Sequence, residues 1–138
     1  LQDISQGKDH FDIARILREQ SAILGEKREY TAAVEKVKEA IAMQKRVYGS
    51  IFSSQSTVAA TYRLLGDFLL EEREYQQADK AYEKAGKINQ AAYQSDVHPY
   101  LARIYQKRAN VLRLQGKISL AEVMEKKSQK IKNSNFEK

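Results

Sequence analysis

The chain has 138 residues, of which 42% are hydrophobic and 30% are charged, and its net charge is +6. This composition excludes a disordered chain and fits one folded domain with a strongly charged surface. The absence of cysteine excludes a disulfide framework, a thiolate zinc site and a cysteine nucleophile, and no apolar run approaches the ~20 residues of a membrane span, so we expect a cytoplasmic protein.

An all-α fold is predicted, because apolar residues recur three and four positions apart and only one Pro interrupts the chain. The six predicted helices cover residues 12–25, 30–48, 55–72, 75–93, 99–115 and 118–132. Gly25 and Gly116 stand where the chain must reverse between helices, and residues 49–56 and 94–98 are predicted loops. Residues 133–138 are expected to form a frayed tail.

A similar sequence motif occurs three times in the chain. REYTAAVEKVKEAI at residues 28–41 recurs as REYQQADKAYEKAGKI at 73–88 and as GKISLAEVMEKKSQKI at 116–131. The aligned alanines Ala33, Ala78 and Ala121 are 45 and 43 residues apart. Small residues also align in the preceding helices, at Ser21, Gly66 and Ala109, where two paired helices can approach closely. The chain is therefore predicted to be a single array of helix pairs at about 12–48, 55–93 and 98–132.

The middle pair resembles the tetratricopeptide signature, through Tyr62, Leu65, Gly66, Leu69, Ala78, Tyr82 and Ala85. The long period, with DHFDIA at residues 9–14 and DVHPYLA at 96–102, resembles the kinesin light chain variety. The resemblance covers residues 9–132. It implies a right-handed α-solenoid of three helix-turn-helix repeats, with the first helices on the concave face and the second helices on the outer face.

The resemblance also implies a protein-interaction module, a scaffold or adaptor that holds a peptide or helix of a partner protein in its concave groove. The family's groove positions fall on Arg15, Arg18, Glu19 and Ala22, on Ala60, Arg63, Leu64 and Asp67, and on Arg103, Gln106, Lys107 and Asn110. Ala22 and Leu64 stand where members that bind chaperones carry Asn. The basic residues predominate, and guanidinium groups bind carboxylates in a bidentate geometry, so the expected ligand is an acidic peptide or a free C-terminal carboxylate.

Two other functions stay open at this point. A spacer or self-association segment of a longer repeat protein would use exposed ends of the stack, for pairing with another copy or for continuation into more repeats. The last helix offers Ile118, Leu120, Val123, Met124 and Ile131 there. Electrostatic binding of nucleic acid or an acidic membrane would use the basic segment at 124–138, but elsewhere Lys and Arg alternate with Glu and Asp. Binding of that kind would weaken steeply with salt.

No catalytic, metal or cofactor site is predicted, and we expect no enzyme activity. The two histidines, His10 and His98, are predicted to lie at equivalent positions in the loop before a first helix, where packing or capping explains them. Most of the eight tyrosines fall on core positions of the repeat, namely Tyr30, Tyr62, Tyr75, Tyr82 and Tyr105. No phosphate-binding loop or Ser-His-Asp constellation is present.

Overall fold

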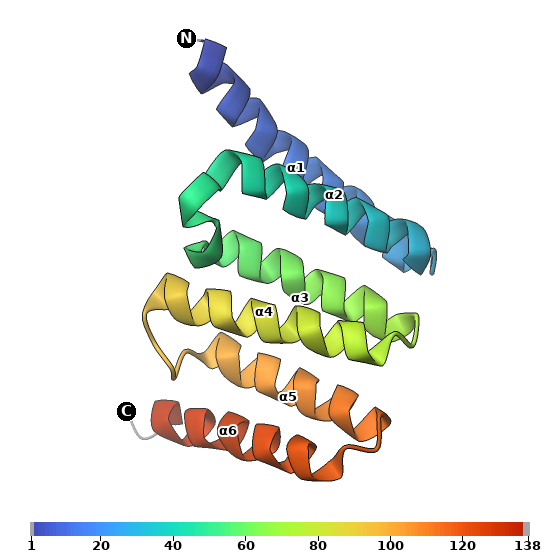
Figure 1. The fold of residues 1–138 in the computed structure, drawn as a ribbon, viewed down its shortest axis with the longest axis vertical. Coiled ribbons are helices and arrows are strands. Elements are labelled where there is room, and N and C mark those ends of the chain that lie inside the picture. The colour runs from blue at the N-terminus through green and yellow to red at the C-terminus, as the bar shows by residue number, and fades with distance from the viewer. Residues whose placement is uncertain (1, 137–138) are drawn as a thin grey trace.

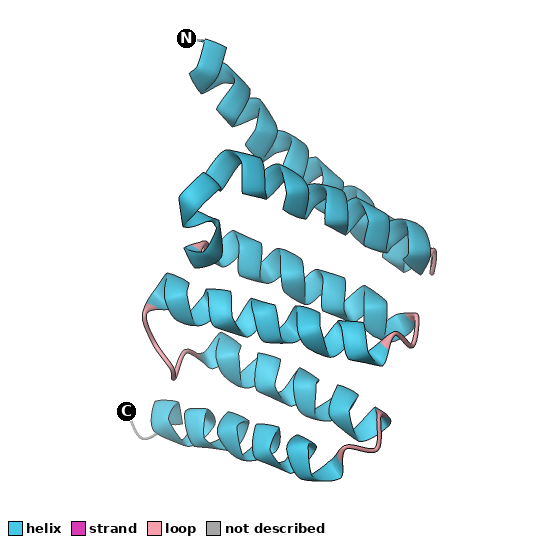
Figure 2. Ribbon diagram, in the orientation of Figure 1, coloured by secondary structure: helices cyan, strands magenta, loops and turns pink. Residues whose placement is uncertain are grey.

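The computed structural model describes residues 2–136, and the side chains of residues 11–135. Within these residues six α-helices and one 3-10 helix follow one another and lie side by side in a stack (Figure 1). They are α1 (Gln2–Glu26), α2 (Tyr30–Tyr48), η1 (Gly49–Ser54), α3 (Ser56–Glu71), α4 (Tyr75–Tyr93), α5 (Pro99–Leu114) and α6 (Ile118–Phe136). Short loops join the helices, and residues 2–136 contain no strand (Figure 2).

The helices form three pairs, as the repeat predicts. α1 packs on α2, α3 on α4 and α5 on α6, while α2 against α3 and α4 against α5 join one pair to the next. The small residues predicted at the helix crossings are all buried: Ser21, Ala33, Gly66, Ala78, Ala109 and Ala121. One core cluster runs from α2 to α5, and it continues as smaller clusters between α5 and α6.

The predicted helix bounds are correct for α2 and α4 but wrong at both ends of the stack. α1 begins at Gln2 rather than Asp12, and α6 continues to Phe136, so residues 133–136 are helical and not a frayed tail. Asp12 was expected to start a helix because aspartate is a preferred residue at helix starts. Residues 2–11 contain no proline, so nothing in that segment ends the helix.

The two histidines do not occupy equivalent places. His10 lies within α1, and its side chain is outside the described residues. His98 precedes α5 as predicted, and its Nδ1 accepts a hydrogen bond of 3.1 Å from the Tyr100 N–H. The His98 ring also stacks on Tyr93, with 4.0 Å between ring centroids. His98 therefore caps α5 and packs the junction between two repeats.

The turn inside each pair uses a left-handed residue at the same position of the repeat. Arg28 and Arg73 both have φ 62°, and Gly116 has φ 77°. Gly25 was predicted to make the first reversal, but it lies within α1, where the helix closely approaches Phe68 of α3. A Cβ at Gly25 would lie 2.5 Å from Cε1 of Phe68, so the missing side chain leaves room for the Phe68 ring.

We expect Gly66→Ala to lower the free energy of unfolding by about 1–2 kcal/mol, although alanine favours helices more than glycine does. A Cβ at Gly66 would lie 2.5 Å from Cε1 of Tyr82, a fully buried ring that has no room to move. Chemical denaturation followed by circular dichroism measures the change.

Gly86→Ala is the matched control. Gly86 is also helical, but its added Cβ would meet Leu101 and Ile104 at 3.3 and 3.4 Å, distances that small shifts of flexible side chains can relieve. This variant should keep or raise stability, by up to about 1 kcal/mol. Equal losses in both variants would contradict the role given to the Tyr82 ring.

Candidate binding site: a basic cleft between three helices

A basic cleft of about 560 Å³ lies where α3, α5 and α6 meet. It is lined by Arg63, Tyr100, Arg103, Gln106, Lys107 and Lys132. Arg63 comes from α3, Lys132 from α6, and the others from α5. Four of the lining residues are cationic and none is acidic, so the cleft attracts a negatively charged group.

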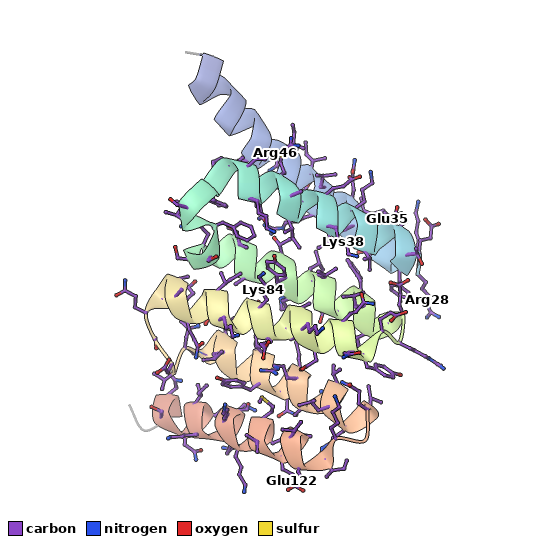
Figure 3. The ribbon with its side chains drawn as sticks, viewed as in Figure 1. Arg28, Glu35, Lys38, Arg46, Lys84 and Glu122 are labelled. Atoms are coloured by element: carbon purple, nitrogen blue, oxygen red, sulfur yellow. The ribbon has the colours of Figure 1, made fainter. Side chains whose placement is uncertain are left out.

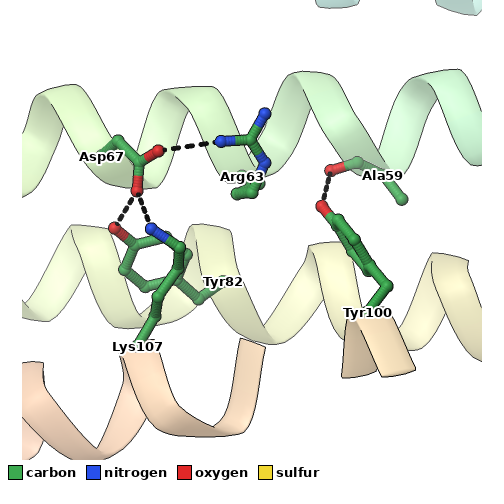
Figure 4. Close-up of polar contacts among 6 residues, drawn as sticks. All are labelled: Ala59, Arg63, Asp67, Tyr82, Tyr100 and Lys107. Carbon is green, nitrogen blue, oxygen red and sulfur yellow. Dashed lines mark hydrogen bonds and ion pairs between the residues drawn. The ribbon is translucent and has the colours of Figure 1, made fainter. Parts of the chain in front are cut away.

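A carboxylate beside the cleft holds two of these cations in place (Figure 4). Asp67 Oδ2 is 3.1 Å from Arg63 Nη1, and Asp67 Oδ1 is 2.9 Å from Lys107 Nζ. Asp67 Oδ1 also accepts a hydrogen bond of 2.5 Å from the hydroxyl of Tyr82. The single carboxylate thus ties α3, α4 and α5 together and compensates part of the charge on Arg63 and Lys107.

The other two cations of the cleft are not compensated in this way. Arg103 and Lys132 are exposed and form no ion pair with any described residue. The hydroxyl of Tyr100 donates to the carbonyl of Ala59 at 3.4 Å, which keeps the Tyr100 ring at the wall of the cleft (Figure 4). The cleft therefore contains two cations without an ion pair, Arg103 and Lys132, beside two that Asp67 holds in place, Arg63 and Lys107.

Tyr100 also lines a second, smaller pocket of about 300 Å³, so the two hollows share a wall. The second pocket is lined by Arg18, Ser56, Thr57, Ala60, Asn89, Tyr93, His98 and Tyr100. Asn89 is 2% exposed, and its Oδ1 has no hydrogen-bond partner among the described residues. Arg18 forms no ion pair with those residues, so it adds another cation next to the cleft.

The structure brings together about half of the residues that the sequence analysis placed in the groove. Arg63, Arg103, Gln106 and Lys107 line the cleft, Asp67 lies beside it, and Arg18 and Ala60 line the neighbouring pocket. Arg15 lines neither hollow, and it pairs with Glu19 at 3.0 Å. Asn110 lines neither hollow, and its Oδ1 accepts a hydrogen bond of 3.2 Å from Gln106.

Sequence reasoning missed Lys132, Tyr100 and Asn89. It confined the groove to first helices, whereas Lys132 and Asn89 belong to second helices, and it read Lys132 as part of a basic end segment. A signal was present in the repeat: Lys132 aligns with Asn89 and with Gln44, offsets of 43 and 45 residues. Gln44 and Asn89 are both buried polar residues with an unpartnered oxygen.

Burial raises the pKa of the Tyr82 hydroxyl far above its ordinary value, and the hydrogen bond to Asp67 and its charge raise it further. Burial also raises the pKa of Tyr62 and of Tyr100. Unfolded tyrosines lose their protons near pH ~10, while these folded ones keep them. The stability that they contribute is therefore complete below pH ~10 and is lost as the pH rises above it.

The alkaline loss of stability should become shallower in Tyr82→Phe. We expect a difference in slope of about 1.4 kcal/mol per pH unit above pH ~10, the value for one proton. Urea denaturation at a series of alkaline pH values gives the slopes of both proteins. A slope in Tyr82→Phe equal to that of the parent protein would contradict the assignment to Tyr82.

Comparison with known proteins identifies the repeat. A family model described as tetratricopeptide repeat matches residues 57–134. The chain belongs to the tetratricopeptide repeat family. Repeats of this family are non-catalytic scaffolds that generally mediate protein–protein interaction. A comparison with curated proteins finds no match.

The tetratricopeptide fold also appears in a solved structure. The crystal structure of BtubC (BKLC) from P. vanneervenii superimposes with a TM-score of 0.79 and 21% sequence identity, over 88% of this chain. This chain spans 47% of the length of that protein. The likeness shows the fold, and the kinesin light chain subtype stays a prediction.

The described part of this tetratricopeptide chain has neither a membrane-spanning helix nor a metal-binding cluster. None of its helices is apolar over a length that could cross a membrane. Among the described side chains, those of residues 11–135, no group of three or more His, Asp and Glu is placed to hold a metal ion.

Proposed function

We propose that this tetratricopeptide unit is a protein-interaction module that captures an acidic segment of a partner protein in the cleft between α3, α5 and α6. The observation that carries the proposal is the set of Arg63, Arg103, Lys107 and Lys132 around one cavity that no acidic residue lines. Four cations in one cavity repel one another, so an anionic ligand lowers the energy of the site.

The chemistry of the cleft favours carboxylates. Arg103 presents a planar fork that can bind a carboxylate through two parallel hydrogen bonds, and Lys132 adds a mobile point charge. Gln106 and the hydroxyl of Tyr100 add polar neutral partners on the same wall. Because Asp67 already orients Arg63 and Lys107, the site loses less side-chain freedom when a ligand binds.

Asn89 extends the same surface toward α1. Its unpartnered, buried Oδ1 can accept a hydrogen bond from a backbone N–H of a bound peptide, and Arg18 can bind a second acidic side chain of that peptide. A ligand with two acidic positions, one in each hollow, therefore uses all of the available polar groups.

Fluorescence anisotropy with labelled peptides tests the proposal. A Glu- and Asp-rich peptide should bind and should weaken as salt rises, and the same peptide with Gln and Asn in place of Glu and Asp should not bind. A single-stranded oligonucleotide of equal net charge serves as the comparison. If the oligonucleotide binds as tightly as the acidic peptide, recognition is electrostatic only and the proposal fails.

A further inference from the structure

Because of the internal repeat, each position of α1 has an equivalent position in α3 and another in α5. Ile13, Ile16 and Ile23 of α1 are 39%, 43% and 53% exposed. Their equivalents, 45 and 88 residues further along the chain, are at most 8% exposed: Val58, Thr61 and Phe68 in α3, and Leu101, Ile104 and Val111 in α5. The same face of the first helix of a repeat is therefore buried in α3 and α5 but exposed in α1.

The two buried examples show what covers this face. α2 packs against α3, and α4 packs against α5. The buried Val34, Val37 and Ile41 of α2 belong to the same core cluster as Val58 and Phe68 of α3. In α4, Gly86 occupies the position of Ile41, and a Cβ there would meet Leu101 and Ile104, the equivalents of Ile13 and Ile16. The cover is in each case the second helix of the preceding repeat.

The other end of the stack has a different surface. α6 carries Glu122, Glu125 and Gln129 at the positions where α2 has Val34, Val37 and Ile41. Glu125 binds Arg113 at 2.6 Å, and Glu122 projects from α6 at the end of the stack (Figure 3). Such residues are typical of a terminal polar cap. A second copy that placed its α6 on α1 would bury two carboxylates against isoleucines, which is unfavourable.

The exposed Val123 of α6 does not change this contrast. Among the five residues expected to expose apolar surface, Met124 and Ile131 are buried, while Ile118, Leu120 and Val123 are exposed. Val123 aligns with Lys80 and Glu35, and both of these are exposed in the interior of the stack. The position of Val123 therefore faces solvent in every repeat, unlike the positions of Ile13, Ile16 and Ile23.

We propose that the face of α1 formed by Ile13, Ile16 and Ile23 is a docking surface for the second helix of a further tetratricopeptide unit. That helix presents aliphatic or small residues at positions i, i+3 and i+7, as α2 does with Val34, Val37 and Ile41. The proposal does not depend on the basic cleft, because α1 supplies none of the residues that line it.

A helix of the required chemistry already exists in the chain and can serve as the probe. A labelled, helix-stapled peptide with the sequence of residues 30–48 should bind the intact protein saturably. A peptide with the sequence of residues 118–136, which carries Glu122, Glu125 and Gln129 on the corresponding face, should bind at least tenfold more weakly. Equal binding of both peptides would overturn the proposal.

Substitutions on α1 test whether the peptide binds at the proposed surface. Ile16→Glu with Ile23→Glu should weaken binding of the 30–48 peptide at least tenfold, while Val123→Glu, a like change at an exposed residue of α6, should leave it unchanged. Circular dichroism checks that each variant stays helical, and Ile16→Ala with Ile23→Ala replaces the glutamate pair if it does not. Binding that neither pair weakens would overturn the proposal.

The oligomeric state separates the further unit from a second copy. Sedimentation of the intact protein should show a monomer at the concentrations used for the peptide. A dimer that Ile16→Glu and Ile23→Glu convert to a monomer would assign the surface to self-association and overturn the proposal. Loss of acidic-peptide binding in the cleft would not affect any of these results.

Discussion

Exchanging Arg103 and Lys132 for glutamate should weaken binding of an acidic peptide on the order of a hundredfold. Hydrogen bonds to charged groups contribute about 1.5–3 kcal/mol each, and the new carboxylates would also repel the ligand. The helical fold should persist, because both side chains are exposed and neither forms an ion pair with a described residue. Anisotropy or calorimetric titration with the peptide gives the affinity, and circular dichroism gives the helicity.

A matched pair of substitutions on another surface makes this result specific. Lys80 and Lys87 of α4 are exposed and line a separate hollow of about 640 Å³. Lys80→Glu with Lys87→Glu changes the net charge by the same amount but should leave peptide binding nearly intact at physiological salt. Loss of binding in this pair and not in Arg103→Glu with Lys132→Glu would move the site to the α4 surface.

The largest loss of stability is expected for Tyr82→Ala, at about 3–5 kcal/mol, the usual range for truncating a buried aromatic ring. Tyr82 is completely buried, its ring fills the space left by Gly66, and its hydroxyl donates to Asp67. Truncation leaves a cavity in the central repeat and removes one partner of the carboxylate that orients the cleft. Urea denaturation measures the loss.

Tyr82→Phe separates the ring from the hydroxyl. It keeps the packing and removes only the hydrogen bond to Asp67, which Arg63 and Lys107 still contact, so it should cost about 1 kcal/mol. If Tyr82→Phe destabilised the protein as much as Tyr82→Ala, the hydroxyl and not the packing of the ring would hold the central repeat together.

The fold could be predicted from the sequence because equivalent residues recur in each repeat and indicate where the helices lie and where they cross. The bounds of α2 and α4 were predicted correctly from aligned tyrosines at both ends of each helix. Local residue preferences alone were misleading at two positions. Asp12 was predicted to start a helix and Gly25 to make a turn, because Asp and Gly favour helix ends. Instead α1 begins at Gln2, and Arg28 adopts the left-handed conformation.

The candidate site could be predicted only in part. The position of a residue in the repeat indicates which face of the helix it occupies, but not which side chain of another helix it contacts. The pairing of Arg15 with Glu19 was visible in their spacing of four residues. The contact of Lys107 with Asp67 was not, because the two residues are 40 positions apart and meet only when α4 packs between their helices in the folded stack. The place of Lys132 in the cleft likewise depends on how α6 packs against α5.

The different chemistry of α1 and α6 also sets the order in which the stack comes apart. Each repeat contacts only its neighbours, so within the described stack α1 and α6 are each held by one interface, whereas the helices between them are held by two. α1 exposes apolar side chains that its interior equivalents bury, and it therefore loses a larger share of its stabilisation than the polar-faced α6 does. Local opening should begin at α1 and travel toward α6. A helix that docks on α1 would then act as a clamp, slowing the first step of unfolding for every repeat behind it.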